Sequence, residues 1–215
     1  MVGAIGAIGL VVVSVGGASA ALQHNTTFAG YTVYAPRLSA GTATFTIPRV
    51  TCGVSSSGVG PGLFALSKKG LTGGGTLVAC VNGAPVYQVG SVINGNEKNT
   101  ITVSPGDLVK VSVSETTKGT SVSVNDLTAK TGDHATGKGG ALTAFLVGTA
   151  AISQNNTQLG VDPFTTVHFS RVTFNGKPLG SYRTIASERV HGKTVQIVPT
   201  AITNGRGFTL VFKHS

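Results

Sequence analysis

The stretch "NTITVSPGDLVKVSVSETT" (residues 99–117) contains two runs in which apolar and polar residues alternate. A period of two residues is typical of a β-strand that buries one face and exposes the other. Pro105-Gly106 separates the two runs and is a dipeptide that favours a turn. The stretch therefore predicts two consecutive strands joined by a turn.

The same kind of pattern recurs from about Gly30 to the end of the chain. Further strand signals occur at residues 42–48, 84–93, 120–132, 166–180, 193–199 and 207–215. Asn-Gly pairs begin at Asn82, Asn94, Asn175 and Asn204, and each can supply the positive φ angles of a tight hairpin turn. Since no segment shows a convincing helical period, the chain is predicted to be an all-β sandwich or jelly roll.

Composition supports this fold class. The 215 residues include 31 Gly and no Trp, and only 11% are charged, which favours strands and turns over helices. A hydrophobic fraction of 40% is enough for a full core. No repeat or linker divides the chain, so we expect one domain over residues 21–215.

The N-terminal segment has the pattern of a signal peptide. Residues 1–23 carry no charged side chain, and the apolar run 5–15 is followed by "ASA" at Ala18 to Ala20. A cleavage site of this kind predicts removal of residues 1–20 and secretion of the remainder. The segment lacks the usual Lys or Arg at its start, and the alternative is an uncleaved N-terminal membrane anchor.

The two cysteines, Cys52 and Cys80, agree with export. They form no C-x-x-C motif and have no accompanying His cluster, so we expect no metal site there. In an oxidising compartment the pair predicts a disulfide; the alternative is two buried free thiols.

The formal net charge of +9 comes from Lys and Arg residues scattered along the chain. They form no dense run and are not interleaved with aromatic residues, so nucleic acid is not an expected partner. For an exported protein, an anionic cell-envelope polymer is a more natural partner for this charge. Simple solubility explains the charge equally well.

Two motifs that could bind a cofactor are rejected. "GDHATGKGG" (residues 132–140) resembles a phosphate-binding loop, but Gly139 occupies the hydroxyl position and a strand pattern follows instead of a helix. We expect no nucleotide there and interpret the segment as a mobile hairpin loop, with Asp133 and His134 solvated in a turn. The five histidines are far apart in sequence, so no metal or other cofactor is expected.

Several stretches, taken in order, resemble the eqolisin-type glutamic peptidases. They are "FAGYTVYAPRLSAGTATFTIPRVTC", "CVNGAPVY", "ITVSPGDLVKVSVSETT", "FTTVHFSRVTFNGKPLG" and "PTAITNGRGFTLVFKHS". Together they cover most of residues 28–215. The resemblance implies a bent, two-sheet, antiparallel β-sandwich of the concanavalin-like jelly-roll type.

The resemblance also implies a peptidase site built from a Glu and a Gln. The Glu acts as general base and then general acid, while the Gln holds the attacking water and stabilises the oxyanion. The matching strand here is "TAFLV" (residues 143–147), with Ala144 at the Glu position and Phe145 at the Trp position. No Glu occurs from residue 116 to 187 and no Gln from residue 24 to 87, so the catalytic pair is missing.

The sequence therefore favours a secreted, non-catalytic relative of these peptidases. We expect a concave groove that includes Ala144, Phe145, Tyr87 and Gln88 and binds peptide or an anionic cell-envelope polymer. The oligomeric state is left open.

Two alternatives remain. One is an active acid endopeptidase with a rearranged site, such as Gln88 with Glu97 or Glu115. The other is a lectin-like module that binds glycans, although an aromatic content of 6% without Trp offers little surface for stacking sugars. Aromatic side chains on one concave face (Tyr31, Tyr34, Tyr87, Phe145) would favour ligand binding, whereas small aliphatic residues there would favour a structural role.

Overall fold

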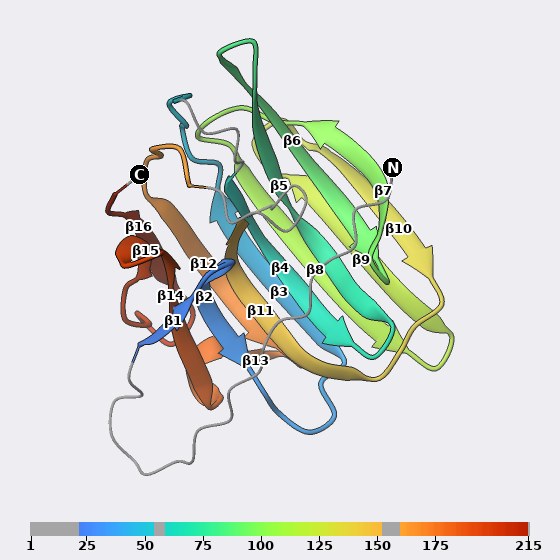
Figure 1. Cartoon of the computed structure of the whole chain (residues 1–215). Coiled ribbons are helices and arrows are strands. Elements are labelled where there is room, and N and C mark those ends of the chain that lie inside the picture. Colours follow the sequence, from blue (N-terminus) through green and yellow to red (C-terminus); the bar gives the residue numbers. More distant parts are fainter. Residues whose placement is uncertain (1–21, 54–58, 152–159, 215) are drawn as a thin grey trace.

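The computed structural model describes residues 22–53, 59–151 and 160–214 (Figure 1). The predicted signal segment, residues 1–20, lies outside the described residues. Within the described ranges no helix is long and apolar enough to cross a membrane. The only helical element there is a short 3₁₀ turn, η1 (Leu179–Ser181).

The described chain is otherwise built from strands, which confirms the all-β prediction. Their bounds are β1 Gln23–Asn25, β2 Phe28–Val33, β3 Ala40–Thr46, β4 Val59–Ser67, β5 Gly70–Val81, β6 Ala84–Ile93, β7 Asn96–Thr102, β8 Leu108–Thr116, β9 Gly119–Asp126, β10 Thr131–Gly137, β11 Leu142–Ala151, β12 Val167–Phe174, β13 Lys177–Pro178, β14 Thr184–His191, β15 Thr194–Pro199 and β16 Phe208–Phe212.

The strands follow one hydrogen-bonded path, β10-β9-β8-β3-β12-β16-β15-β14-β2-β11-β4-β5-β6-β7. The path curls over on itself, so that β3, β8 and β9 pack against β4, β5 and β6 (Figure 1). We call β10, β9, β8, β3, β12 and β16 the β8 layer, and β14, β2, β11, β4, β5, β6 and β7 the β11 layer. All pairings along the path are antiparallel; the short β1 joins β14 in parallel. The bent antiparallel architecture is thus confirmed.

The two ends of the path also meet. Strand β10 packs against β7, and the side-chain amide of Asn99 donates a hydrogen bond of 2.9 Å to Asp133 Oδ1. The curled sheet therefore brings its two terminal strands side by side at one margin of the sandwich.

The core fills the space between the layers. Val109, Val111 and Val113 alternate inward along β8, and each fully buried side chain of this size contributes about 1.5–3 kcal/mol through the hydrophobic effect. Aromatic rings extend the core toward β12 and β16, where Phe169 stacks on Phe208 with centroids 4.7 Å apart. The alternation that predicted the strands is the same alternation that builds this core.

The Asn-Gly pairs form the turns that they predict. The φ angles are 52° and 77° at Asn82-Gly83, which joins β5 to β6, and 53° and 77° at Asn94-Gly95, which joins β6 to β7. Asn175-Gly176 joins β12 to β13 with the same left-handed geometry. Asn and Gly tolerate positive φ at little cost, so the sequence fixes these hairpins locally.

The expectation of a mobile loop at residues 132–140 is wrong for most of that segment. Gly132 to Gly137 lie in β10, which pairs with β9 along its whole length. Asp133 and His134 therefore occupy a strand and not a turn. Only Ala135 gives β10 an apolar inward residue, at 7% exposure, so the strand has almost no hydrophobic alternation to reveal it.

The predicted disulfide is confirmed. Cys52 and Cys80 are bonded, with Cα atoms 5.8 Å apart, and the bond joins the segment after β3 to the end of β5. Asp162 lies beside it, almost fully buried, and its Oδ1 accepts a hydrogen bond of 3.2 Å from the Gly53 amide. The bond closes a loop with a sequence separation of 28 residues.

Replacing both cysteines with serine should lower the free energy of unfolding by about 3.5 kcal/mol, because a loop of this length then regains its entropy in the unfolded chain. Urea unfolding followed by circular dichroism measures the change. The unaltered protein in reducing agent should unfold at the same midpoint as the double variant. Equal stability of the oxidised protein and the variant would contradict the prediction.

Candidate functional site

The strand that carries Ala144 lies in the middle of the β11 layer, between β2 and β4. Successive side chains of a strand point to opposite faces. Phe145 and Val147 point into the core, so Ala144, Leu146 and Gly148 belong to the outward face, the side turned away from the core. The candidate site is therefore this outward face of the β11 layer.

Ala144 holds no reactive group and sits among apolar residues. It pairs with Leu66 of β4 just after an irregularity in the register, and Leu146 follows it on the same face. Its side chain is 1% exposed. The position where the resemblance expects a carboxylate thus offers a methyl group shielded from solvent.

Phe145 does not line a groove. Its side chain is completely buried and packs against Phe174 of β12, with ring centroids 4.9 Å apart. It also lies against Gly41, where an added Cβ would come within 2.7 Å of the ring. Phe145 is therefore a core residue that joins the two layers.

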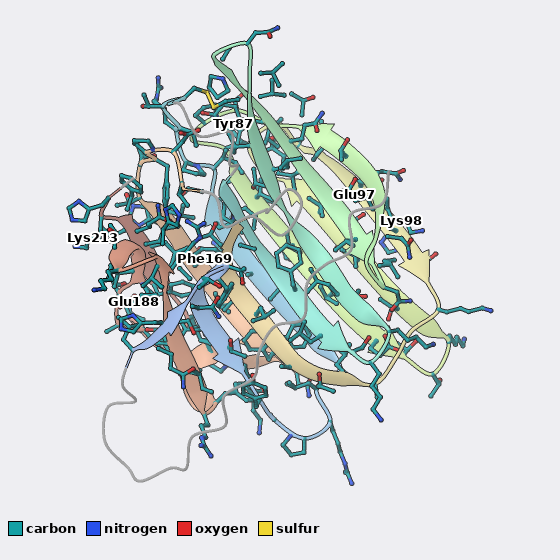
Figure 2. All side chains as sticks on the ribbon, viewed as in Figure 1. Tyr87, Glu97, Lys98, Phe169, Glu188 and Lys213 are labelled. Carbon is teal, nitrogen blue, oxygen red and sulfur yellow. A yellow bond between two sulfur atoms is a disulfide. The ribbon has the colours of Figure 1, made fainter. Side chains whose placement is uncertain are left out.

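Tyr87 and Gln88 are neighbours on β6 and point to opposite faces. Tyr87 points inward, and its hydroxyl accepts a hydrogen bond of 2.9 Å from the Val50 amide (Figure 2). Gln88 points outward opposite Thr102. Tyr87 thus holds the segment after β3, and only Gln88 of the pair belongs to the candidate site.

Ala144 and Gln88 share the outward face but lie far apart. Strands β4 and β5 separate β11 from β6, and the pairings place Gln88 several residues further along the strands than Ala144. With strands about 4.8 Å apart and a rise of about 3.3 Å per residue, the separation is on the order of 20 Å. The four predicted groove residues are therefore not brought together.

This face carries a line of glycines that we call the glycine row. Five glycines occupy paired positions on five neighbouring strands, so the row has no Cβ atoms. In spatial order they are Gly30 of β2, Gly148 of β11, Gly62 of β4, Gly75 of β5 and Gly90 of β6. Ser187 of β14 and Thr100 of β7 close the row at its two ends.

The row requires glycine at its β2–β11 end. Gly30 has φ 141°, and a Cβ there would lie 2.3 Å from the Val147 carbonyl oxygen. A Cβ on Gly148 would lie 2.1 Å from the Ala29 oxygen and 2.8 Å from the Gly30 Cα. The two backbones approach too closely at this point for any side chain.

Two phenylalanine rings lie over the row. The Phe28 ring tip would be 3.0 Å from a Cβ on Gly30 and 2.9 Å from one on Gly148. The Phe64 ring would lie 2.7 Å from a Cβ on Gly62 and 2.6 Å from one on Gly75. The missing side chains therefore leave room for rings to lie flat against the sheet.

Sequence reasoning missed these two aromatics and chose others. Tyr31, Tyr87 and Phe145 are core residues, and only Tyr34, at 39%, is exposed. These four aromatics therefore do not line one concave face, and they give no support to ligand binding. The signal that could have found Phe28 and Phe64 is their spacing, since each lies two residues from a glycine of the row on the same strand face.

The carboxylates considered for a rearranged site do not form one with Gln88. Glu97 faces Val92 at the free edge of β7, and Gln88 is four residues from Val92 along β6, about 13 Å. Figure 2 shows Glu97 and Lys98 at this edge, on the opposite side of the molecule from Glu188. Glu115 belongs to the β8 layer, where its carboxylate accepts a hydrogen bond from the Thr120 hydroxyl.

A buried polar pair lies on β14 and β15, where Arg189 is two residues beyond Ser187 at the end of the glycine row. The Arg189 guanidinium donates a hydrogen bond to the Gln196 side-chain oxygen, and both residues are almost completely buried. Burial lowers the pKa of Arg189 to about 10, so the group remains charged near neutral pH. Next to Arg189 in the sequence, Glu188 has its Oε1 atom 2.7 Å from Nδ1 of His24 on β1.

The outward face between β2 and β6 thus offers glycines, apolar side chains and two rings, and the described residues place no Asp or Glu on it. Among the residues that the structure describes, no group of three or more His, Cys, Asp or Glu side chains could hold a metal ion. Among the described residues, the part of this face between β2 and β6 thus carries no carboxyl group that could transfer a proton.

Comparison with solved structures shows which known fold this chain shares. The chain has the fold of scytalidoglutamic peptidase. The structure of that enzyme with a transition-state analogue inhibitor matches with a TM-score of 0.72 and 13% identity, over 87% of this chain and 98% of the other. SCP-B, a member of the eqolisin family of peptidases in complex with the tripeptide Ala-Ile-His, matches with a TM-score of 0.70 and 14% identity over the same shares.

No family model and no curated protein matches the sequence. The predicted resemblance to the eqolisin-type peptidases is therefore confirmed at the level of the fold. At such low identity the chemistry of the site has to be argued from the residues present.

Replacing Gly30 with alanine should lower the free energy of unfolding by about 3 kcal/mol, since the new Cβ meets backbone atoms and the φ angle is unfavourable. Gly140→Ala is the matched control, because its Cβ would meet only the flexible Lys69 side chain and Ser67 Oγ at 3.3–3.4 Å. Urea unfolding of both variants gives the comparison. Similar midpoints for the two would show that the close approach at the row is not rigid.

Proposed function

We propose that this chain is an exported, non-catalytic protein of the glutamic-peptidase fold whose outward β11-layer face binds an extended peptide. The observation that carries the proposal is the combination of an intact fold with an alanine, Ala144, at the expected carboxylate position. The face keeps its place in the architecture while its surface is made of glycines, apolar side chains and the rings of Phe28 and Phe64.

The absence of catalysis follows from the chemistry of this face. A general acid–base group typically contributes about 10²–10⁴-fold to a rate, and an oxyanion donor a further 10²–10³-fold or so. A methyl group supplies neither contribution. Gln88, Glu97 and Glu115 lie too far from Ala144 and from one another to replace the missing pair.

Peptide binding is supported by the shape of the face and by its structural neighbours. Glycines at five successive strands leave a strip without Cβ atoms, and the buried Phe28 ring and the partly exposed Phe64 ring lie over part of it. The matched solved structures hold a tripeptide in one case and a peptide-based transition-state analogue in another. Recognition through shape and apolar contacts needs no catalytic group.

Export is supported by the confirmed disulfide between Cys52 and Cys80 and by the signal-peptide pattern of residues 1–20. Both features fit an oxidising extracellular compartment.

The purified protein should not hydrolyse casein at any pH from about 2 to 7, because the described residues place no Asp or Glu on the face of Ala144 between β2 and β6. Scytalidoglutamic peptidase, incubated with casein in parallel under the same conditions, is the positive control. Gel electrophoresis and mass spectrometry of the products measure cleavage. Robust cleavage by this protein would overturn the non-catalytic assignment and direct attention to Glu97, Glu115 and Asp162.

The tripeptide Ala-Ile-His should bind saturably, as measured by ligand-detected NMR titration at several protein concentrations. Leu146→Arg should abolish binding, because Leu146 lies on the outward face beside the glycine row and a long charged side chain would cover it. Val86→Arg is the control. Val86 is exposed on the same face near the start of β6, and this variant should bind the tripeptide normally. Equal binding by both variants would place the peptide elsewhere.

The exported protein should begin near Ala21. Intact-mass measurement of protein recovered from the culture medium checks this. A mass that still includes residues 1–20, with the protein retained on membranes, would indicate an N-terminal anchor instead.

A further inference from the structure

The outward face of the β8 layer differs from the glycine row in chemistry. Since Val109, Val111 and Val113 point inward, the alternate residues of β8 point away from the core. Their pairing partners on β3, β9 and β10 share that face. The result is a strip of mostly polar side chains: Thr42, Ser112, Ser123 and His134 in one row, Ser114, Ser121 and Thr136 in a second, and Lys110 and Asn125 beside the buried Thr44 in a third.

These side chains form a connected polar surface. The Thr42 and Ser112 hydroxyl oxygens are 3.4 Å apart, and those of Ser114 and Ser121 are 2.8 Å apart. The described strands β8, β9 and β10 contain no Phe, Tyr or Trp, and their one aromatic ring is the exposed imidazole of His134. The strip therefore offers many hydrogen-bonding groups in regular rows and little surface for ring stacking.

An open hollow lies at each end of the strip, and each is flanked by two exposed lysines. The first, of about 680 Å³, is lined by Lys110 and Lys130 together with Ser123 and Asn125. The second, of about 470 Å³, is lined by Lys118 and Lys138 together with Ser114. About six residues of β8 separate the two ends, which corresponds to roughly 20 Å.

Two carboxylates, Asp126 and Asp133, also line the first hollow. Asp126 pairs with the buried Val109 and Asp133 with the buried Val124, so both belong to the inward side of their strands. Asp126 Oδ1 accepts hydrogen bonds from the amides of Thr128 and Ala129. Asp133 Oδ1 accepts the bond from Asn99 described above. The lysine charge is therefore partly offset at the first hollow, whereas the described residues that line the second hollow include no Asp or Glu.

We propose that this strip, formed by the outward side of β8, β9 and β10, binds an acidic polysaccharide. The lysine pairs at the two ends attract carboxylate groups along the polymer, and the hydroxyl and amide rows between them hydrogen-bond the sugar hydroxyls. An extended chain that spans about 20 Å meets both lysine pairs at once, which a small anion cannot do. Single-stranded nucleic acid fits less well, because it gains much of its affinity from aromatic stacking.

The proposal does not depend on the peptide-binding function proposed above, since the strip lies on the other layer. The probe is polygalacturonate, with fully methyl-esterified polygalacturonate as the uncharged control polymer. Binding to the full mature chain is measured at pH 7 by affinity electrophoresis and by titration calorimetry at low and at physiological salt. We expect binding of the acidic polymer that weakens with salt, and much weaker binding of the methyl-esterified one.

A variant with Lys110, Lys118, Lys130 and Lys138 all changed to Gln should bind about tenfold more weakly, the loss expected when four exposed ion pairs are removed. The charge-matched control changes Lys98, Lys177, Lys193 and Lys213 to Gln; these lysines are exposed and lie outside the strip. The control should lose no more than about twofold through the lower net charge. Thermal unfolding of both variants verifies that they are folded.

A second variant tests the middle of the strip without touching a lysine. Ser123→Glu places a negative charge between the two lysine pairs and should also weaken binding about tenfold, by repelling the polymer and removing a hydroxyl. Equal losses in the two lysine variants, unchanged binding by Ser123→Glu, or equal binding of the charged and esterified polymers would overturn the proposal. Tighter binding of a single-stranded oligonucleotide, abolished by the same lysine changes, would also overturn it.

Discussion

The contact on which the site depends is the close backbone approach of β2 and β11 at Gly30 and Gly148. These strands lie at the centre of the β11 layer, and no side chain separates them at this point. Three more strands continue the line with glycine. Because the row has no side chains, the Phe28 ring lies over Gly30 and Gly148, and the Phe64 ring lies over Gly62 and Gly75.

That arrangement explains how a fold can persist while its chemistry changes. The core contacts of Phe145, Tyr87 and the valines of β8 use only the inward half of each strand. Outward positions outside the glycine row can vary without disturbing these contacts, because strand alternation separates the two sets of residues. The sandwich is therefore compatible with an alanine at position 144, and the fold alone does not tell which outward groups are present.

The sequence predicted the features that depend on residues close together in the chain. It did not predict the features that depend on which strands pair with each other. Alternation and the Asn-Gly turns are local, so most strands and hairpins were predicted correctly. Strand β10 was missed because its residues are polar or glycine and only its partner β9 makes it a strand. The grouping of Ala144 with Phe145, and of Tyr87 with Gln88, could not have been right, since adjacent residues of a strand face opposite sides. The glycine row could not be predicted from the sequence, because its members come from five separate segments and only the strand pairings align them.

The meeting of β7 and β10 has a consequence for how the protein behaves at high concentration. A sheet with two free edges offers unpaired backbone groups to which another chain can add a strand, and this is a common route to aggregation. Here the curl places one edge strand against the other, bridged by Asn99 and Asp133, while Glu97 and Lys98 put charges of both signs on β7. The geometry that encloses the core thus also covers part of these two edges, which hinders the addition of a further strand in a molecule so rich in strands.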